Sequence, residues 1–309
     1  MLISGIEAPP GAAAAYGVAV RTETLTELVV DGGRIHAERT GPPGADAVLL
    51  LHAGVADRRV WDRVVAPLAA AGYDVVRYDM RGYGRSVPAT EPHSLVADAL
   101  AVLDAAGVDA AHFVGLSQGA ATGVDTALAH PGRVRSLTLV APGLTGYEWP
   151  RLPGFAGRMA AAEAGDTHGL ALEIARLWAP LSFGADAGAG AGAGAGASAG
   201  ASAGAGGGKG ECDAAAKIIL DQAEQFMRDE LEIEEPSAIG RLGEIGAPTL
   251  VVLGDSDVEP ITDIGRILTE GIPGARCETL PRADHMLPLR VPEELTRLLL
   301  AHMQQRGDG

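Results

Sequence analysis

A serine between two glycines has the spacing of a reactive group. Ser117 lies in the run Gly115–Gly119 (GLSQG), after the apolar residues Phe113 and Val114 and before a stretch with helical periodicity. A strand, a tight turn and a helix in that order hold a serine nucleophile in a strained turn, and the glycines let neighbouring backbone pass closely. We therefore expect the Ser117 hydroxyl to point into a cleft at the start of a helix.

Two further serines match the same pattern, Ser198 and Ser202, inside a tract of alanine and glycine that covers residues 187–208. A tract without large side chains has nothing to bury and favours neither a helix nor a packed strand, so we expect a flexible loop there. Neither serine follows a strand, and both are expected to be chance matches.

A serine hydroxyl needs a base within hydrogen-bond reach and an acid that orients the base. Among eight histidines, His285 lies in the loop after the last expected strand, directly before the terminal helix. The acid should follow a strand between Ser117 and His285, which leaves Asp255 and Asp257, and Asp257 is favoured because it lies deeper in its loop. Asp284 is adjacent to His285 in sequence and would orient it poorly.

The negative charge that develops during attack on a carbonyl needs two backbone N–H donors. One is the N–H of Gln118, the residue after the nucleophile, and the other should come from the loop after the third strand. In the run Leu51–Val55 (LHAGV), the N–H of Gly54 is the best candidate.

Apolar runs and amphipathic stretches alternate along the first half of the chain. Residues 24–31 and 34–40 predict a hairpin around Gly32 and Gly33. Strands are then expected over 47–51, 74–78, 112–115 and 136–141, and helices over 61–71, 94–105 and 118–129. Strands rich in Val and Leu between amphipathic helices are typical of a parallel sheet covered on both sides. The expected fold class is therefore α/β, with a mostly parallel central sheet flanked by helices.

The same alternation returns after Pro248, with strands over 249–253 and 276–280 and helices over 261–269 and 292–305. Residues 159–163, 170–178 and 214–230 have helical spacing. We therefore expect a core made of residues 1–146 and 247–309, and a helical lid, residues 147–246, over the carboxyl edge of the sheet, where open α/β sheets bind ligands.

Some side chains outside the reacting set could line a substrate pocket. They are Trp149 and Trp178 in the lid, for which packing is the alternative role, and Met286 beside the expected base. An acidic cluster is expected to be a solvated helix end, and would disfavour anionic substrates if it faced the cleft; its members are Glu230, Glu232, Glu234 and Glu235.

Taken together, these motifs resemble the α/β-hydrolase superfamily. His52-Ala53-Gly54 is similar to its His-Gly-x loop, the run DMRGYGRS over residues 79–86 to its D-x-R-G-x-G-x-S segment, and Gly115–Gly119 to its nucleophile turn. Ala53 and Asp284 stand where glycine is usual, which affects loop geometry and substrate fit but removes no reacting atom. The order Ser117, Asp257, His285 is the order of this superfamily.

The resemblance implies a hydrolase that cleaves a carboxylic ester or lactone through an acyl-enzyme, with no metal or organic cofactor. A serine nucleophile sets the chain apart from dehalogenases and epoxide hydrolases, which use aspartate, and the motifs are similar to those of bacterial enol-lactone hydrolases and cofactor-free haloperoxidase-type esterases. Perhydrolysis or hydrolysis of a C–C bond on the same fold stays open as an alternative, as does a ligand-binding protein without turnover.

The composition limits which classes of binding partner are expected. With 24 Lys and Arg against 40 Asp and Glu, the formal charge is −16, which repels nucleic acids and anionic membranes. Cys212 and Cys277 form no metal or disulfide pattern, and the N-terminus does not read as a signal peptide. We therefore expect a cytoplasmic monomer or homodimer that acts on a small molecule.

Overall fold

The computed structural model describes residues 22–30, 32–184, 213–228 and 231–304. The alanine and glycine tract with Ser198 and Ser202 falls outside these ranges, as do Cys212 and Glu230. The predictions made for them are therefore left as predictions.

The first two strands form the expected antiparallel hairpin, β1 (Thr22–Val30) and β2 (Gly33–Thr40). The predicted turn was one residue too late, because Gly33 is already paired with Val30. Gly32 has a φ of +69°, a left-handed conformation that glycine adopts without strain.

Eight strands form one sheet in the order β1-β2-β4-β3-β5-β6-β7-β8. From β4 to β8 every neighbouring pair is parallel, so all of these strands end at the same edge. The central strands are apolar and fully buried, as parallel strands covered on both faces must be. Their bounds are β3 (Ala47–Leu51), β4 (Asp74–Tyr78), β5 (Ala111–Leu116), β6 (Val134–Val140), β7 (Thr249–Gly254) and β8 (Arg276–Leu280).

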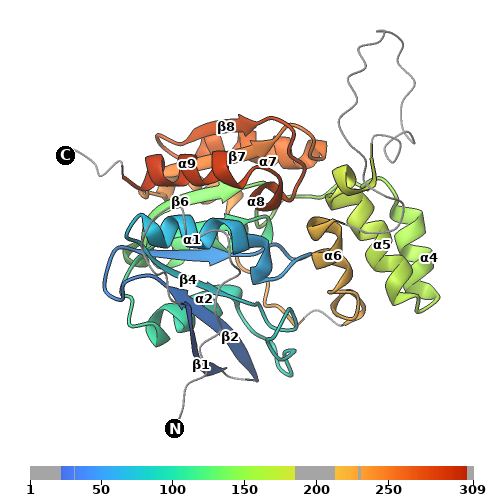
Figure 1. The fold of residues 1–309 in the computed structure, drawn as a ribbon. Helices are drawn as coiled ribbons and strands as arrows, with labels where there is room; N and C mark the ends of the chain where they lie inside the picture. The colour runs from blue at the N-terminus through green and yellow to red at the C-terminus, as the bar shows by residue number, and fades with distance from the viewer. Residues whose placement is uncertain (1–21, 31, 185–212, 229–230, 305–309) are drawn as a thin grey trace.

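Helices cover both faces of the sheet, and the predicted α/β class is confirmed. On one face α1 packs with α9, and on the other α2 packs with α3 (Figure 1). The bounds of the helices around the sheet are α1 (Asp62–Ala70), α2 (Leu95–Ala105), α3 (Gln118–Ala129), α7 (Glu259–Gly271), α8 (Leu287–Arg290) and α9 (Pro292–Met303). Short 3-10 turns add η2 (Arg58–Trp61) before α1, η3 (Pro131–Arg133) before β6 and η7 (Ile239–Glu244) between α3 and α7.

In the described residues between β6 and β7 there are three α-helices, and Figure 1 shows them grouped beside one end of the sheet. They are α4 (Phe155–Glu163), α5 (Thr167–Trp178) and α6 (Ala214–Leu220), with 3-10 turns η4 (Pro180–Phe183) and η6 (Gln225–Met227). The helix predicted over 214–230 was too long, since α6 ends at Leu220. We call the stretch between β6 and β7, residues 141–248, the helical insertion.

A hydrogen-bonded cluster joins the two flanks of residues 185–212. Arg290 in α8 donates to Ser182 (2.7 Å) and also bonds Asp213, and Ser182 itself donates to Asp213 (2.6 Å). Asp284 accepts from Arg290 and from the backbone N–H of Leu181. The helical insertion is thus hydrogen-bonded to the core both before and after residues 185–212.

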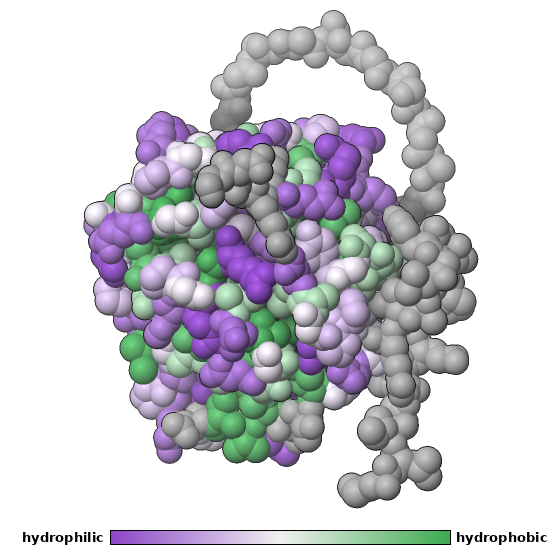
Figure 2. Space-filling view, turned by 90° about the vertical axis from the view of Figure 1, so that its left-hand side faces the viewer, coloured by the Kyte–Doolittle hydropathy of each residue, from purple (hydrophilic) through white to green (hydrophobic). Residues whose placement is uncertain are grey.

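Exposed apolar side chains concentrate on the helical insertion. Of the eight large hydrophobic residues exposed in the part of the chain that the structure describes, all but Val29 lie between β6 and β7. The face turned away from the insertion mixes hydrophilic and hydrophobic residues (Figure 2). None of the described helices is long and apolar enough to cross a membrane.

Candidate active site

Ser117 lies at the tip of a strained turn between β5 and α3. Its φ of +55° is in the left-handed region, which costs a residue other than glycine about 1–3 kcal/mol. The turn is fixed by backbone hydrogen bonds on both sides: the N–H of Ser117 donates to Val140 (3.0 Å), and its carbonyl accepts from Gly143 (3.0 Å) and Ala120 (2.9 Å). Such stored strain, held by surrounding bonds, is typical of a functional position.

The two flanking glycines are required by space. A Cβ at Gly115 would lie 2.2 Å from the carbonyl oxygen of Gly119, and a Cβ at Gly119 would lie 2.5 Å from that of Leu51 in β3. Both contacts are with backbone, which cannot move aside. The glycine spacing around Ser117 therefore follows from the close approach of α3 to the sheet.

His285 and Asp257 come together from two neighbouring loops at the carboxyl edge. Nδ1 of His285 is 2.8 Å from Oδ2 of Asp257, and both side chains are buried. Oδ1 of Asp257 accepts the N–H of Val258 (2.8 Å). Because a carboxylate only accepts, Nδ1 carries the proton, and Nε2 of the neutral ring has a free lone pair.

The two other candidate aspartates have different partners. Asp255 is exposed and accepts from the Ser256 hydroxyl (2.9 Å) and, more weakly, from the N–H of Ala283 (3.3 Å). Asp284 is fully buried, but its carboxylate pairs with Arg290 (2.9 Å) and caps the N–H of Met286 (3.1 Å). Of the three aspartates, Asp257 is the one that bonds the His285 ring.

His52 fixes the loop after β3. Its Nε2 accepts the N–H of Met80 (2.8 Å), so its Nδ1 carries the proton and donates to the carbonyl of Ala53 (2.8 Å). That carbonyl belongs to the same peptide unit as the N–H of Gly54. Burial lowers the pKa of His52, which keeps the ring in this neutral form.

The side chain of Gln118 reaches Gly54 from the other side. A Cβ at Gly54 would lie 2.4 Å from Oε1 of Gln118, so a larger residue there would displace the amide or the loop. Nε2 of Gln118 donates to Glu232 (2.6 Å), whose segment, residues 231–233, pairs with His93 through two backbone hydrogen bonds. Gly54 and Gln118, predicted from distant parts of the sequence, are therefore in contact.

The described members of the acidic cluster are solvated in part, as predicted, since Glu232 and Glu234 are exposed, but they do not lie at a helix end. Glu232 bonds Gln118, and Glu235 accepts from the hydroxyl of Ser94 (2.6 Å). Glu232 is exposed beside the start of α3, and Glu235 is half-buried beside the start of α2. A negative charge thus lies beside the residue that follows Ser117.

The segment Asp79–Ser86 braces these loops. The carboxylate of Asp79 is buried and accepts the N–H of Arg58 and of Arg85 (2.9 Å each). Tyr83 adds a contact that the motif alone does not indicate, since its hydroxyl donates to the carbonyl of Gly54 (2.7 Å).

Aromatic rings of the insertion reach His285. The ring centroid of Trp178, the last residue of α5, is 4.3 Å from that of His285, and Trp149 meets Trp178 edge to face at 6.3 Å. Tyr147 contacts Trp149 in the same way at 5.4 Å. Met286, in contrast, is fully buried in the hydrophobic core.

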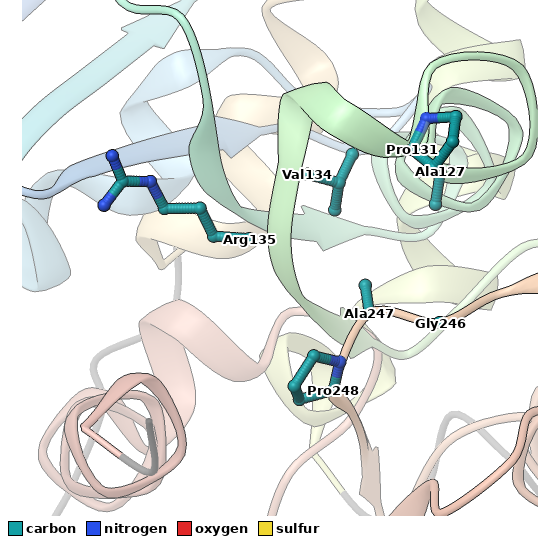
Figure 3. A pocket seen from close by; sticks show the side chains of 7 residues that line it. All are labelled: Ala127, Pro131, Val134, Arg135, Gly246, Ala247 and Pro248. Atoms are coloured by element: carbon teal, nitrogen blue, oxygen red, sulfur yellow. The ribbon is translucent and has the colours of Figure 1, made fainter. Parts of the chain in front are cut away.

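Two cavities lie away from these side chains. One, of about 220 Å³, is at the amino ends of β6 and β7, the opposite edge of the sheet from Ser117 (Figure 3). The other cavity, of about 780 Å³, is a cleft. One side is formed by the segment Asp79–Ser86 at Gly82 and Gly84, and the other by residues at the start of α5 and after α6. Neither lining includes Ser117, Asp257 or His285.

The family model that describes the alpha/beta hydrolase fold matches residues 46–290, which hold every residue of the site just described. The chain belongs to the α/β-hydrolase fold family. The superfamily resemblance and the predicted fold are thereby confirmed.

Relatives within this α/β-hydrolase family are named after different substrates. The chain is 30% identical over 293 residues to rhodomycin D methylesterase of Streptomyces sp. strain C5, which covers 89% of this chain and 96% of that protein. It is 31% identical over 264 residues to 2-hydroxy-6-oxononadienedioate/2-hydroxy-6-oxononatrienedioate hydrolase of Cupriavidus pinatubonensis, covering 82% and 84%. The crystal structure of the enol-lactonase from Burkholderia xenovorans has a TM-score of 0.63 at 22% identity, covering 89% of this chain and 98% of that one, a likeness of fold.

Proposed function

We propose that this α/β-hydrolase is a serine hydrolase that cleaves a carboxylic ester or lactone of a small molecule through an acyl-enzyme. The observation that carries the proposal is the hydrogen bond between Asp257 and His285, which leaves Nε2 of the imidazole free to accept a proton. Ser117, in its strained turn, is the nucleophile, His285 the general base and Asp257 the residue that orients the base.

In the acylation step, Oγ of Ser117 attacks the carbonyl carbon while its proton passes to Nε2 of His285. The electron pair of the C=O bond moves to the oxygen and forms a tetrahedral oxyanion. When this intermediate collapses, the bond to the alcohol oxygen breaks, and His285 gives its proton to that oxygen. The acyl group stays on Ser117.

In the deacylation step, a water molecule attacks the acyl carbon and gives one proton to His285. The second tetrahedral intermediate then releases the carboxylic acid, and the proton returns to Oγ of Ser117. A lactone follows the same course, except that the released hydroxyl remains part of the acyl chain.

The N–H groups of Gly54 and Gln118 are the proposed donors to the oxyanion. The hydrogen bond from His52 to the Ala53 carbonyl supports this role, because it orients and polarises the peptide unit that carries the Gly54 N–H. In comparable enzymes, a single oxyanion donor lowers the activation free energy by about 2.7–4 kcal/mol.

A second candidate reaction is hydrolysis of a C–C bond, suggested by the relative named 2-hydroxy-6-oxononadienedioate hydrolase. A dienedioate carries two carboxylates, whereas the residue after Ser117 bonds Glu232, and Glu235 lies nearby. Repulsion between like charges disfavours a dianion in this site, so we rank ester cleavage first.

Labelling with a fluorophosphonate probe tests the proposal. We expect the wild-type protein to be modified at Ser117, found by peptide mapping, and to hydrolyse short p-nitrophenyl esters or lactones. Ser117→Ala should lose both properties. If the wild-type protein stays unlabelled, or if Ser117→Ala hydrolyses esters as fast as the wild type, the proposed function is wrong. A diketone assayed in parallel distinguishes the C–C bond reaction.

A further inference from the structure

We propose that Trp178, Trp149 and Tyr147 form a subsite for an aromatic group on the alcohol side of the scissile ester. This inference rests on the proposed serine hydrolase function and names the class of substrate. We call these three rings the aromatic stack.

The aromatic stack leads from the expected base toward solvent. The Trp178 ring touches the imidazole of His285 at 4.3 Å, Trp149 follows at 6.3 Å and Tyr147 at 5.4 Å beyond it. The two contacts between stack members have interplanar angles of 84° and 83°. In an edge-to-face contact the edge of one ring meets the face of the other, so each contact leaves ring faces uncovered.

Exposure separates the outer ring of the stack from ordinary core packing, whereas Tyr147 and Trp178 are partly buried against the core. Trp149 exposes 44% of its surface, whereas Trp61, whose indole packs in the core, exposes 0%. Leu181, three residues after Trp178 in the chain, is also 44% exposed. Large apolar surfaces that stay in contact with water beside a reactive site indicate a place where an apolar group binds.

The chemistry of the base assigns the stack to the alcohol side. His285 must deliver its proton to the leaving oxygen, so that oxygen lies within hydrogen-bond reach of Nε2, and the alcohol group starts beside the imidazole. The carbonyl oxygen instead points to Gly54 and Gln118. The ring that covers His285 is Trp178, so the group attached to the leaving oxygen is the part of the substrate that meets the stack.

Ring geometry favours an aromatic group over an alkyl group of the same size. Two aromatic rings in edge-to-face or offset contact attract each other beyond the effect of buried area, and two-ring contacts of this kind correspond to about a two- to tenfold change in affinity. A saturated ring fills the same space without this attraction.

Matched pairs of substrates test the inference. Benzyl acetate and cyclohexylmethyl acetate have leaving groups of similar size and basicity, so the ratio of their kcat/KM values measures the preference for an aromatic ring. We expect the wild-type protein to favour benzyl acetate by about two- to tenfold. Trp149→Leu should lower the ratio toward one, with the ring of Trp178 left in place, and Trp149→Tyr should retain the wild-type preference. Phe155→Leu, which removes an exposed aromatic ring outside the stack, should keep the wild-type ratio.

Other outcomes overturn the inference in distinct ways. If both acetates are hydrolysed at equal kcat/KM by the wild type, the stack does not select aromatic groups, although the serine hydrolase proposal stands. If ethyl phenylacetate is preferred over ethyl cyclohexylacetate while the benzyl preference is absent, the stack serves the acyl side. If 2-(trimethylammonio)ethyl acetate is preferred over 3,3-dimethylbutyl acetate while the benzyl preference is absent, the rings select cations. Absence of labelling at Ser117 and of all ester hydrolysis would instead reject the proposed function.

Discussion

The two oxygens of Asp257 have separate tasks. Oδ1 is held by the N–H of Val258, which begins the approach to α7, and Oδ2 faces the imidazole of His285. The backbone bond fixes the rotation of the carboxylate, and the carboxylate in turn fixes the tautomer of the ring. Asp255, two residues earlier, bonds only its own and the neighbouring loop.

Substitution of these two aspartates provides a matched comparison. In Asp257→Asn, an amide can present N–H to Nδ1 and stabilise the wrong tautomer, so we expect kcat for a short ester to fall by about 10³- to 10⁴-fold. Asp255→Asn should change kcat by less than about threefold, because it leaves the bond to His285 in place. Steady-state kinetics of both purified variants measures this. Equal losses in the two variants would contradict the assignment of Asp257.

Asp125 in α3 makes the stability of the protein depend on pH. Burial, helped by the nearby charge of Glu235, raises the pKa of Asp125 to about 6, although the hydrogen bond from Thr145 opposes the shift. The native state therefore holds this proton more tightly than the unfolded state. Its stabilising contribution is complete below about pH 4 and is lost as the pH rises through about 6.

Asp125→Asn, which resembles the protonated form at every pH, should remove that loss. We expect its free energy of unfolding to exceed that of the wild type by up to about 3 kcal/mol at pH 8 and to match it near pH 4. Urea unfolding at the two pH values gives the comparison. Asp263→Asn, on the exposed face of α7, also removes one charge and should show no such divergence. A pH-independent difference for Asp125→Asn would refute the argument.

At the scale of elements, the proposed oxyanion hole is formed where three segments meet. The loop after β3 supplies Gly54, the start of α3 supplies Gln118, and residues 231–233 hold the Gln118 side chain through Glu232. Tyr83 holds the Gly54 carbonyl from the bracing segment. The space at Gly54 is thus set by a side chain from another element.

A rescue experiment tests this arrangement. Gly54→Ala would place a methyl group 2.4 Å from Oε1 of Gln118, so either the loop or the amide must shift. We expect a fall in kcat of about 10- to 100-fold, smaller than the full loss of an oxyanion donor. In a Gln118→Ala background, which keeps the backbone N–H, the same change should cost less than about threefold. A penalty of the same size in both backgrounds would show that another contact requires the glycine.

At the scale of the whole molecule, the sequence predicts helices and strands whose residues follow a regular hydrophobic pattern, and turns that need particular backbone geometry. The bounds of β3, β4, β8 and α3 agree with prediction to the residue. β3 and β4 are buried apolar strands, which have a strong local pattern, and α3 begins directly after the glycine-flanked turn at Ser117. The contact between Gln118 and Glu232, by contrast, joins residues 114 positions apart through side chains without regular spacing. The same holds for the stacking of Trp178 on His285. Such contacts depend on how the helical insertion is seated, which no local pattern encodes.

The helical insertion should tolerate removal of the chain between its two tied ends. Ser182 and Asp213 are hydrogen-bonded to each other and to Arg290, so a short Gly/Ser linker in place of residues 185–212 spans a small distance. Because loop-closure entropy varies only with the logarithm of length, we expect the free energy of unfolding to change by less than about 1 kcal/mol. Ester hydrolysis should stay within about threefold of wild type. Insoluble protein after this replacement would show that the segment has a structural role.

The same tie bears on where the polypeptide could begin and end. Because the side chains of Ser182 and Asp213 hold the two flanks together without a peptide link between them, a circularly permuted protein with new termini at 184 and 213 should keep α5 and α6 in place. A linker would then join the two ends of the given sequence. A chain break between residues 184 and 213 should therefore leave the pairing of Asp257 with His285 intact, and a reporter domain could be inserted at the same place.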